Sequence, residues 1–186
     1  MPQQEFNLLD RLIRYLRLRE ISPYLKKDDV VCDLGCGDGN ILEALSPKIK
    51  KGYGIDKESF DSERGNLRFI HGDITKTLPF GNERFDVILS LAVLEHLESP
   101  DPIFSEARRT LKKRGLFILT TPAPLSKPLL EFSAFKLGII SSKEIKEHKH
   151  YYSKQELINL LKKHNFKTIK LKPFCLGFNI LAVARK

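Results

Sequence analysis

Two carboxylates stand at the ends of two short apolar runs, and each could bind a hydroxyl or ammonium group of a ligand. Asp33 closes the run that begins at Val30, and glycines follow it at positions 35, 37 and 39. Glycine lets the backbone turn through positive φ and lets a ligand lie against bare main chain, so this spacing indicates a strand that bends around a ligand. An ordinary glycine-rich turn is the alternative interpretation.

The second carboxylate, Asp56, ends the apolar segment that starts at Gly52. Its distance from the glycines suits the second strand of a βαβ unit, where an acid accepts both hydroxyls of an unphosphorylated ribose. The dinucleotide pattern G-x-G-x-x-G needs glycine where Asn40 stands, and Asp38 would repel phosphates. The sequence therefore predicts a ligand with ribose but without phosphate, and it disfavours the alternative of a nicotinamide-dependent oxidoreductase.

Alternating apolar segments and helical patterns predict an α/β fold that must position these acids. We expect a three-layer, Rossmann-like, seven-stranded and mostly parallel sheet with an antiparallel C-terminal strand and helices on both faces. Helices are expected over 4–20, over 101–113 with Asp101 as its cap, and after a capping box of Ser153 and Glu156. The strands are expected near 30–34, 52–55, 67–71, 85–90, 115–121, 166–172 and 178–185. Ligands of such sheets bind at the carboxyl ends of the strands, where the acids stand.

Several blocks of the sequence resemble the class I S-adenosylmethionine-dependent methyltransferases, in particular their small-molecule type 11 branch. They occur in the order typical of the family and begin at Asp33, Asp56, His71, Phe85 and Leu111. Together with the C-terminal elements they cover most of residues 28–186. The resemblance implies transfer of a methyl group from S-adenosylmethionine to a small-molecule acceptor, which is expected to be either apolar or acidic.

The resemblance also implies roles for the first two blocks. Gly35 and Gly37 give clearance for the amino-acid part of the cofactor, and Asp33 helps to hold its ammonium group. Asp56 accepts from the ribose hydroxyls, and Lys57 directly follows it.

The remaining cofactor contacts come from later blocks. The resemblance implies that Asp73 accepts from the adenine amine, that the Ile74 amide donates to the ring, and that Leu91 lies beside the cofactor. For Asp73, a turn-forming acid is the alternative interpretation. Cys36 stands between two of the glycines and belongs to the cofactor loop, although we expect its side chain to be a small packing residue.

Methyl transfer is an in-line displacement, so catalysis can come from aligning the reactants and excluding water. An oxygen or nitrogen acceptor also needs a base, and His96 is the candidate because histidine titrates near neutral pH. Packing at a helix start is the equally weighted alternative. His148 and His150 are further candidates, but two histidines without a carboxylate in register do not predict a metal site.

Residues 122–152 lie where the family places its substrate cover. The apolar residues between 129 and 140 fit a lid over an apolar acceptor or a face that touches a lipid surface. A cap helix that buries itself on the sheet is the favoured interpretation, because apolar stripes usually belong to a core.

Length and composition agree with one methyltransferase domain over residues 1–186. No segment has the apolar length of a membrane span, and the first residues do not resemble a signal peptide, so we expect a cytoplasmic enzyme. The three cysteines form no C-x-x-C pair, which predicts neither a disulfide framework nor a zinc site. Abundant Lys, Glu and Arg without Trp suggest a thermophilic source. No pattern predicts a particular oligomeric state.

The formal net charge is +9, and residues 143–172 hold nine lysines against three glutamates. Such a stretch could attract nucleic acid or an acidic substrate. The chain lacks an aromatic-rich RNA-binding signature and the N/D-P-P-Y/F block, so a nucleic-acid partner is not favoured. An RNA-directed methyltransferase and a non-catalytic cofactor-binding module remain the alternative interpretations.

Overall fold

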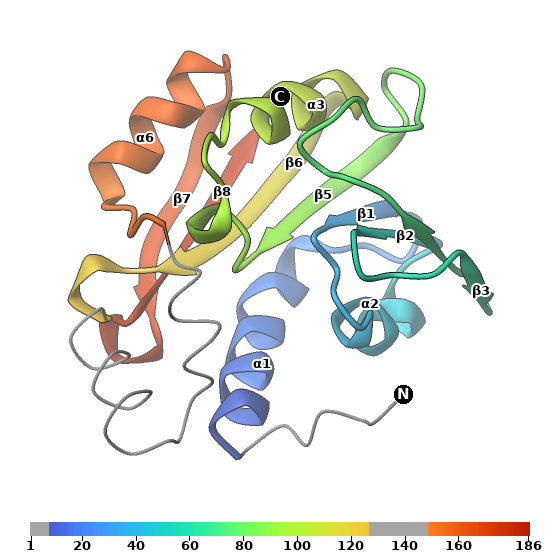
Figure 1. Ribbon diagram of the computed structural model, residues 1–186, viewed down its shortest axis with the longest axis horizontal. Coiled ribbons are helices and arrows are strands. Elements are labelled where there is room, and N and C mark those ends of the chain that lie inside the picture. Colours follow the sequence, from blue (N-terminus) through green and yellow to red (C-terminus); the bar gives the residue numbers. More distant parts are fainter. Residues whose placement is uncertain (1–7, 127–148) are drawn as a thin grey trace.

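The computed structural model describes residues 8–126 and 149–186 of the chain. Within these residues, eight strands form one sheet in the order β3-β4-β2-β1-β5-β6-β8-β7 (Figure 1). The strands are β1 (Val30–Leu34), β2 (Lys51–Asp56), β3 (Ser62–Arg64), β4 (Leu67–His71), β5 (Phe85–Leu91), β6 (Leu111–Pro122), β7 (Lys167–Phe174) and β8 (Asn179–Arg185). Neighbours from β4 to β6 pair in parallel, whereas β8 is antiparallel to both β6 and β7.

The predicted α/β sheet is confirmed, with one strand added. All seven expected strands are present, and the last two form an antiparallel pair. The additional strand β3 pairs antiparallel with β4 at the edge of the sheet. Its residues, Ser, Glu and Arg, are all polar, so they lack the apolar alternation from which a strand can be predicted.

Helices cover both faces of the sheet. The helices α1 (Leu8–Ile21) and α2 (Asn40–Leu45) lie on one face, and α3 (Asp101–Thr110) and α6 (Lys154–Lys163) lie on the other (Figure 1). Short 3-10 turns complete the described elements: η1 (Ser22–Tyr24), η2 (Ser46–Lys48), η3 (Leu94–His96), η4 (Pro124–Ser126) and η5 (Cys175–Gly177). Across the described ranges, none of the helices has the length and apolar character that crossing a membrane requires.

Each face has its own hydrophobic core. Ile21 and Leu42 pack with Leu89 on the side of α1 and α2. Phe104 and Leu161 pack on the opposite side, where α3 and α6 lie. Burial of apolar residues from both directions explains why the central strands are nearly continuous apolar runs, as is typical of parallel sheets.

The expected cap of α3 is wrong in detail. Asp101 is the first helical residue, the N-cap is Pro100, and no side chain caps the helix. The Asp101 carboxylate instead contacts the C-terminal end of α6, where it accepts hydrogen bonds from the Lys163 and His164 side chains at 2.7 Å each. The helix also ends at Thr110, before the expected end, because the chain becomes extended where β6 begins.

The predicted capping box at the start of α6 is confirmed. The Ser153 hydroxyl accepts from the Glu156 amide at 3.3 Å, and the Glu156 carboxylate accepts from the Ser153 amide at 2.7 Å. Two amides that a helix leaves without an intrahelical partner are thereby satisfied.

We expect Ser153→Ala to lower the free energy of unfolding by about 1 kcal/mol, because it removes the side-chain acceptor of the cap. Ser153→Gly is the matched control, since glycine at an N-cap costs only a few tenths of a kcal/mol. Urea unfolding followed by circular dichroism measures both variants. Equal stability of the alanine variant and the wild type would contradict the importance of this cap.

Candidate functional site

The turn that joins β1 to α2 is fixed to the end of β2 by main-chain hydrogen bonds. The amides of Gly35 and Cys36 both donate to the carbonyl oxygen of Ile55, at 2.8 and 3.2 Å. Gly35 has φ +81°, and a Cβ atom there would lie 2.5 Å from Cγ2 of Val93. The turn therefore requires glycine at this position, as the sequence predicted.

Asp56, at the end of β2, faces this glycine turn. One carboxylate oxygen accepts from the Gly37 amide and the other from the Glu58 amide, both at 2.9 Å. A carboxylate oxygen can accept more than one hydrogen bond, so both oxygens keep capacity for a ligand. The side chain remains partly exposed, which leaves that capacity within reach.

Asp33, at the adjacent end of β1, is buried with 2% of its surface exposed. Its Oδ1 atom forms no hydrogen bond with any residue that the structure describes. Burial raises the pKa of Asp33 to about 7, against the opposing effect of the Arg17 cation, and the Asp56 charge raises it further. A buried oxygen without a donor is rare, and it indicates a place where a ligand's donor fits.

Arg17 brings a cation from α1 to this site, and sequence reasoning missed it. Its Nε atom is buried and has no hydrogen-bond partner among the described residues. Burial lowers the pKa of Arg17, and the nearby charges of Glu95 and Asp33 raise it. One signal was available, because Arg17 lies four residues after Ile13 and so continues the apolar stripe of the helix.

Glu95 is a second buried acid that sequence reasoning missed as a site residue. It lies in η3, just after β5, with 1% of its surface exposed, and its Oε2 atom accepts from the Thr121 hydroxyl at 3.1 Å. Burial raises the pKa of Glu95 to about 7. Its main-chain carbonyl accepts from the amides of Lys149 and His150, at 2.7 and 3.3 Å, so it also fixes the chain that leads into α6.

Asp73 lies beyond the end of β4, in a turn that is joined to β2 through the Gly72 amide and the Asp56 carbonyl at 3.0 Å. Its Oδ1 atom accepts from both the amide and the hydroxyl of Thr75, at 2.9 and 2.6 Å. These bonds hold the pKa of Asp73 below its ordinary value. The turn-forming role is thus present, and an adenine contact at this acid stays a prediction.

The other predicted cofactor residues differ in exposure. Cys36 is buried, and its sulfur lies 3.5 Å from the Ser59 hydroxyl, which agrees with a packing role. Ile74 and Leu91 are also buried, whereas Lys57 is exposed. The structure brings the ends of β1, β2, β4 and β5 together, so these residues surround one region of the sheet edge.

The two described histidines among the candidates, His96 and His150, have different side-chain surroundings. His96 is half-buried in η3, next to Glu95, and its amide donates to the Val93 carbonyl at 3.0 Å. His150 instead contacts the Glu156 carboxylate, 2.9 Å away, beside α6. His148 lies outside the described residues. Across residues 8–126 and 149–186, no three His, Cys, Asp or Glu side chains are arranged to hold a metal ion.

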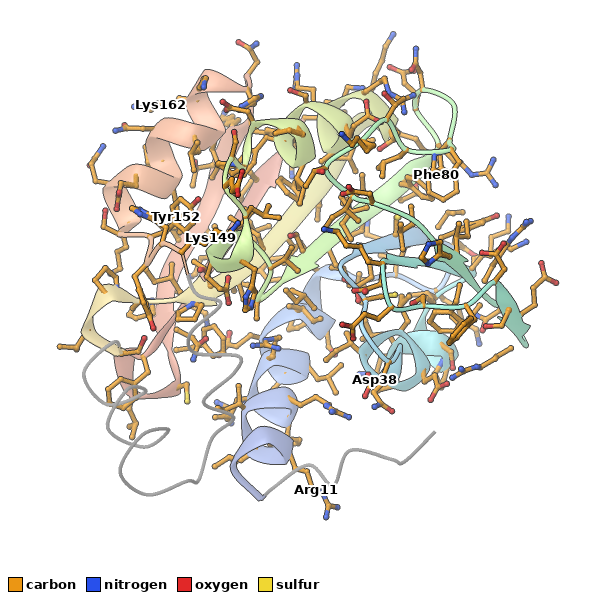
Figure 2. All side chains as sticks on the ribbon, in the orientation of Figure 1. Arg11, Asp38, Phe80, Lys149, Tyr152 and Lys162 are labelled. Atoms are coloured by element: carbon orange, nitrogen blue, oxygen red, sulfur yellow. The ribbon has the colours of Figure 1, made fainter. Side chains whose placement is uncertain are left out.

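Several lysines of the basic stretch are engaged in ion pairs. Lys149 pairs with Glu98, Lys163 with Asp101, and Lys172 with Glu20. Lys162 lies on the outer side of α6 (Figure 2). The described part of this stretch is therefore spread over α6 and the edge strand β7, where lysine also discourages strand pairing between molecules.

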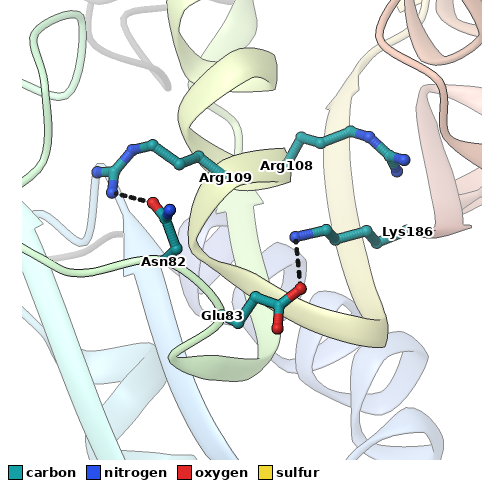
Figure 3. A pocket seen from close by; sticks show the side chains of 5 residues that line it. All are labelled: Asn82, Glu83, Arg108, Arg109 and Lys186. Carbon is teal, nitrogen blue, oxygen red and sulfur yellow. Dashed lines mark hydrogen bonds and ion pairs between the residues drawn. The ribbon is translucent and has the colours of Figure 1, made fainter.

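A hollow of about 480 Å³ lies at the opposite end of the sheet (Figure 3). Arg109 there holds the preceding loop, since it donates to Glu106, Asn82 and the Phe80 carbonyl. Lys186 reaches toward Glu83, and the Arg108 guanidinium points away from the hollow. Arg109 and Lys186 are thus engaged by neighbouring residues of the fold.

The family of the chain follows from comparison with known proteins. A family model described as a methyltransferase domain matches residues 4–171. The chain belongs to the class I S-adenosylmethionine-dependent methyltransferases. The expected enzyme class and cofactor are thereby confirmed, and the oxidoreductase alternative is set aside.

Individual relatives of this methyltransferase include enzymes with named roles. A ubiquinone biosynthesis O-methyltransferase from Pelagibacter ubique is 26% identical over 97% of this chain and 80% of its own length. A demethylmenaquinone methyltransferase from Leptospira interrogans is 28% identical over 90% of this chain and 71% of its own. A solved S-adenosylmethionine-dependent methyltransferase from Archaeoglobus fulgidus shares the fold, with a TM-score of 0.71, 20% identity, and coverage of 95% of this chain and 94% of its own.

We expect the free energy of unfolding of the ligand-free methyltransferase to fall as the pH rises from about 5 to about 7. In this range the folded protein holds more protons than the unfolded chain, because burial raises the pKa of both Asp33 and Glu95 to about 7. Each acid contributes at most about 1.4 kcal/mol per pH unit. Asp33→Asn and Glu95→Gln should each make the fall shallower in urea unfolding.

The control for this pH dependence is Glu98→Gln, because the side chain of Glu98 is 88% exposed. It should keep the wild-type slope. A slope that neither buried-acid variant changes would contradict the burial of these two carboxyl groups.

Proposed function

We propose that this methyltransferase transfers its methyl group to a small apolar acceptor, and that it holds S-adenosylmethionine at the carboxyl ends of β1, β2, β4 and β5. The buried Asp33 oxygen without a donor, beside the Arg17 cation, is the observation that carries the proposal. The Asp33 oxygen lacks a hydrogen-bond donor, and the Arg17 Nε atom lacks an acceptor. The amino-acid part of the cofactor offers both, because it carries an ammonium and a carboxylate.

The residues of the site fit each part of the cofactor. Asp33 would accept from the ammonium, and the buried Nε of Arg17 would donate to the carboxylate. Asp56 would accept from the two ribose hydroxyls, with Lys57 next to it, because both of its oxygens keep acceptor capacity. Charge-assisted hydrogen bonds of this kind are stronger than neutral ones, so this end of the ligand would contribute much of the binding.

The adenine ring would lie between the turn after β4 and the end of β5. Asp73 would accept from the exocyclic amine through Oδ2, since Oδ1 is engaged with Thr75. The Ile74 amide would donate to the ring, and Leu91 would pack beside it. Gly35 and Gly37 would leave their backbone open to the ligand, with Cys36 packed beneath them.

S-adenosylmethionine supplies an electrophilic methyl group on a sulfonium when it is bound. The protein then has to hold the acceptor in line with that methyl group and keep water away. Buried residues at the ends of β1 and β5 favour such a dry site. His96 would take the proton of an acceptor hydroxyl, because it ends η3, the turn that follows β5 at the edge where the cofactor is proposed to bind.

The apolar nature of the acceptor is supported by the relatives, which are named for ubiquinone biosynthesis and for demethylmenaquinone. The small-molecule acceptor predicted from the sequence agrees with both names. The apolar residues of the predicted substrate cover, which lie outside the described residues, are consistent with the same class.

Two ligands allow the amino-acid contacts and the ribose contacts of the proposed cofactor site to be tested independently. S-adenosylhomocysteine carries the amino-acid part, whereas methylthioadenosine lacks it. We expect Asp56→Ala to weaken binding of both ligands at least about tenfold, because the ribose contact is common to them. Arg17→Met should weaken only S-adenosylhomocysteine. Isothermal titration calorimetry measures both.

Glu58→Ala is the matched control for these variants, because Glu58 contacts Asp56 only through its main-chain amide. It should bind both ligands like the wild type. Retained binding of methylthioadenosine by Arg17→Met shows that this variant is folded. Unchanged binding of both ligands by Asp56→Ala would overturn the proposed site.

For catalysis, we expect His96→Asn to lower kcat about a hundredfold or more for a hydroxyl acceptor such as a demethylated short-chain quinol. Affinity for S-adenosylhomocysteine should not change, because the cofactor contacts lie elsewhere. His150→Asn, which alters an exposed histidine paired with Glu156, is the control and should keep wild-type kcat. A His96→Asn variant with wild-type kcat would remove His96 from the mechanism.

A further inference from the structure

Two neighbouring turns expose leucine side chains at the same edge of the sheet. Leu125 in η4 is 70% exposed, and Leu176 in η5 is 91% exposed. The turns are joined by a hydrogen bond from the Ala123 amide to the Phe178 carbonyl at 2.9 Å. Single exposed leucines are common, but two on adjoining tips form an apolar feature that the core does not explain.

The backbone of η5 holds Leu176 outward. Cys175, Leu176 and Gly177 all have positive φ, at 51°, 56° and 92°. A non-glycine residue rarely adopts this left-handed conformation, and it persists only where the surrounding structure holds it in place. Cys175 packs against the core, whereas Leu176 points into solvent. The outward position of this leucine is therefore built into the turn.

The C-terminal end of helix α1 lies near this edge. It is attached to β7 by the ion pair of Glu20 with Lys172. Its outer face exposes Leu12 at 50% and Tyr15 at 60%, which lie one turn apart. The rim is defined here by these four apolar residues: Leu12, Tyr15, Leu125 and Leu176.

Two exposed arginines lie on the same helix as Leu12 and Tyr15 of the rim. Arg11 and Arg19 are exposed on α1, and Arg11 lies at the end of the helix that points away from the sheet (Figure 2). Apolar side chains between arginines are typical of surfaces that bind anionic lipid, since the apolar groups enter the acyl region and the guanidinium groups stay with the phosphates.

The rim lies beside the proposed cofactor site. Cys175 in η5 packs against the hydrophobic core that includes Ile21 of α1, the helix that also carries Arg17. Helix α1 and the two turns lie on the side toward which β5 runs (Figure 1). A surface bound to the rim would therefore face the same edge as the bound cofactor.

We propose that the rim binds the surface of an anionic phospholipid bilayer, from which the enzyme takes its apolar acceptor. The proposal rests on the apolar acceptor inferred above, and it commits to lipid because separate leucine tips suit insertion between head groups. A nucleic-acid surface offers phosphates and bases but no apolar region that these leucines could enter.

Vesicle flotation tests this proposal with the full chain. The wild type should float with vesicles of phosphatidylcholine and phosphatidylglycerol, and less with phosphatidylcholine alone. The double variant Leu125→Ser/Leu176→Ser should lose binding on the order of tenfold. Arg11→Gln/Arg19→Gln should lose only the preference for phosphatidylglycerol. Phe60→Ser is the matched control, because Phe60 is 67% exposed near β3, away from the rim, and should bind like the wild type.

Three outcomes would overturn the proposal: no flotation of the wild type, flotation of the double variant like the wild type, or an equal loss in Phe60→Ser. Sedimentation without vesicles provides a fourth, because a dimer that the double variant dissociates would make a second copy the occupant of the rim. Titration of each variant with S-adenosylhomocysteine separates the two proposals. Binding of that ligand without flotation rejects only the lipid surface, whereas its absence rejects the proposed cofactor site.

Discussion

Two buried carboxylates and one arginine are electrostatically coupled at the carboxyl end of the sheet, and the proposed site depends on them. Asp33 comes from β1, Glu95 from the turn after β5, and Arg17 from α1. Burying an ionised carboxylate is costly unless an opposite charge or a donor compensates it. Charge compensation therefore links three elements that are distant in the sequence. A ligand that carries both an ammonium and a carboxylate could supply the remaining partners of these buried groups.

Hydrogen bonds of the surrounding backbone fix the positions of these acidic side chains. The glycine turn after β1 is bonded to the carbonyl of Ile55 and to the carboxylate of Asp56, so β1 and β2 present their acids at fixed positions. Glu95 adds a second constraint, because its side chain bonds to Thr121 and its carbonyl binds the chain before α6. Rigid strands thus hold both the proposed cofactor contacts and the neighbouring His96, as precise positioning of a transferred group requires.

Helix α1 has two roles in this view of the enzyme. Its inner face delivers Arg17 to the buried acids, and its outer face carries Leu12 and Tyr15 of the rim. In the proposed arrangement, one short helix would connect the binding of the charged cofactor with the approach of an apolar acceptor. At the opposite end of the sheet, Arg109 is bound to the Phe80 carbonyl and to Glu106.

The sequence by itself determined the sheet, the capping box of α6, and the acids Asp33 and Asp56 at strand ends, because each follows from local periodicity or from glycine spacing. Tertiary structure alone decided that Arg17 and Glu95 belong to the same site. Their charges influence each other although they come from α1 and from the turn after β5, and no pattern within one element encodes the proximity of two elements. It also decided that Asp101 binds α6 rather than capping α3, because the Lys163 and His164 side chains reach it only after the two helices pack.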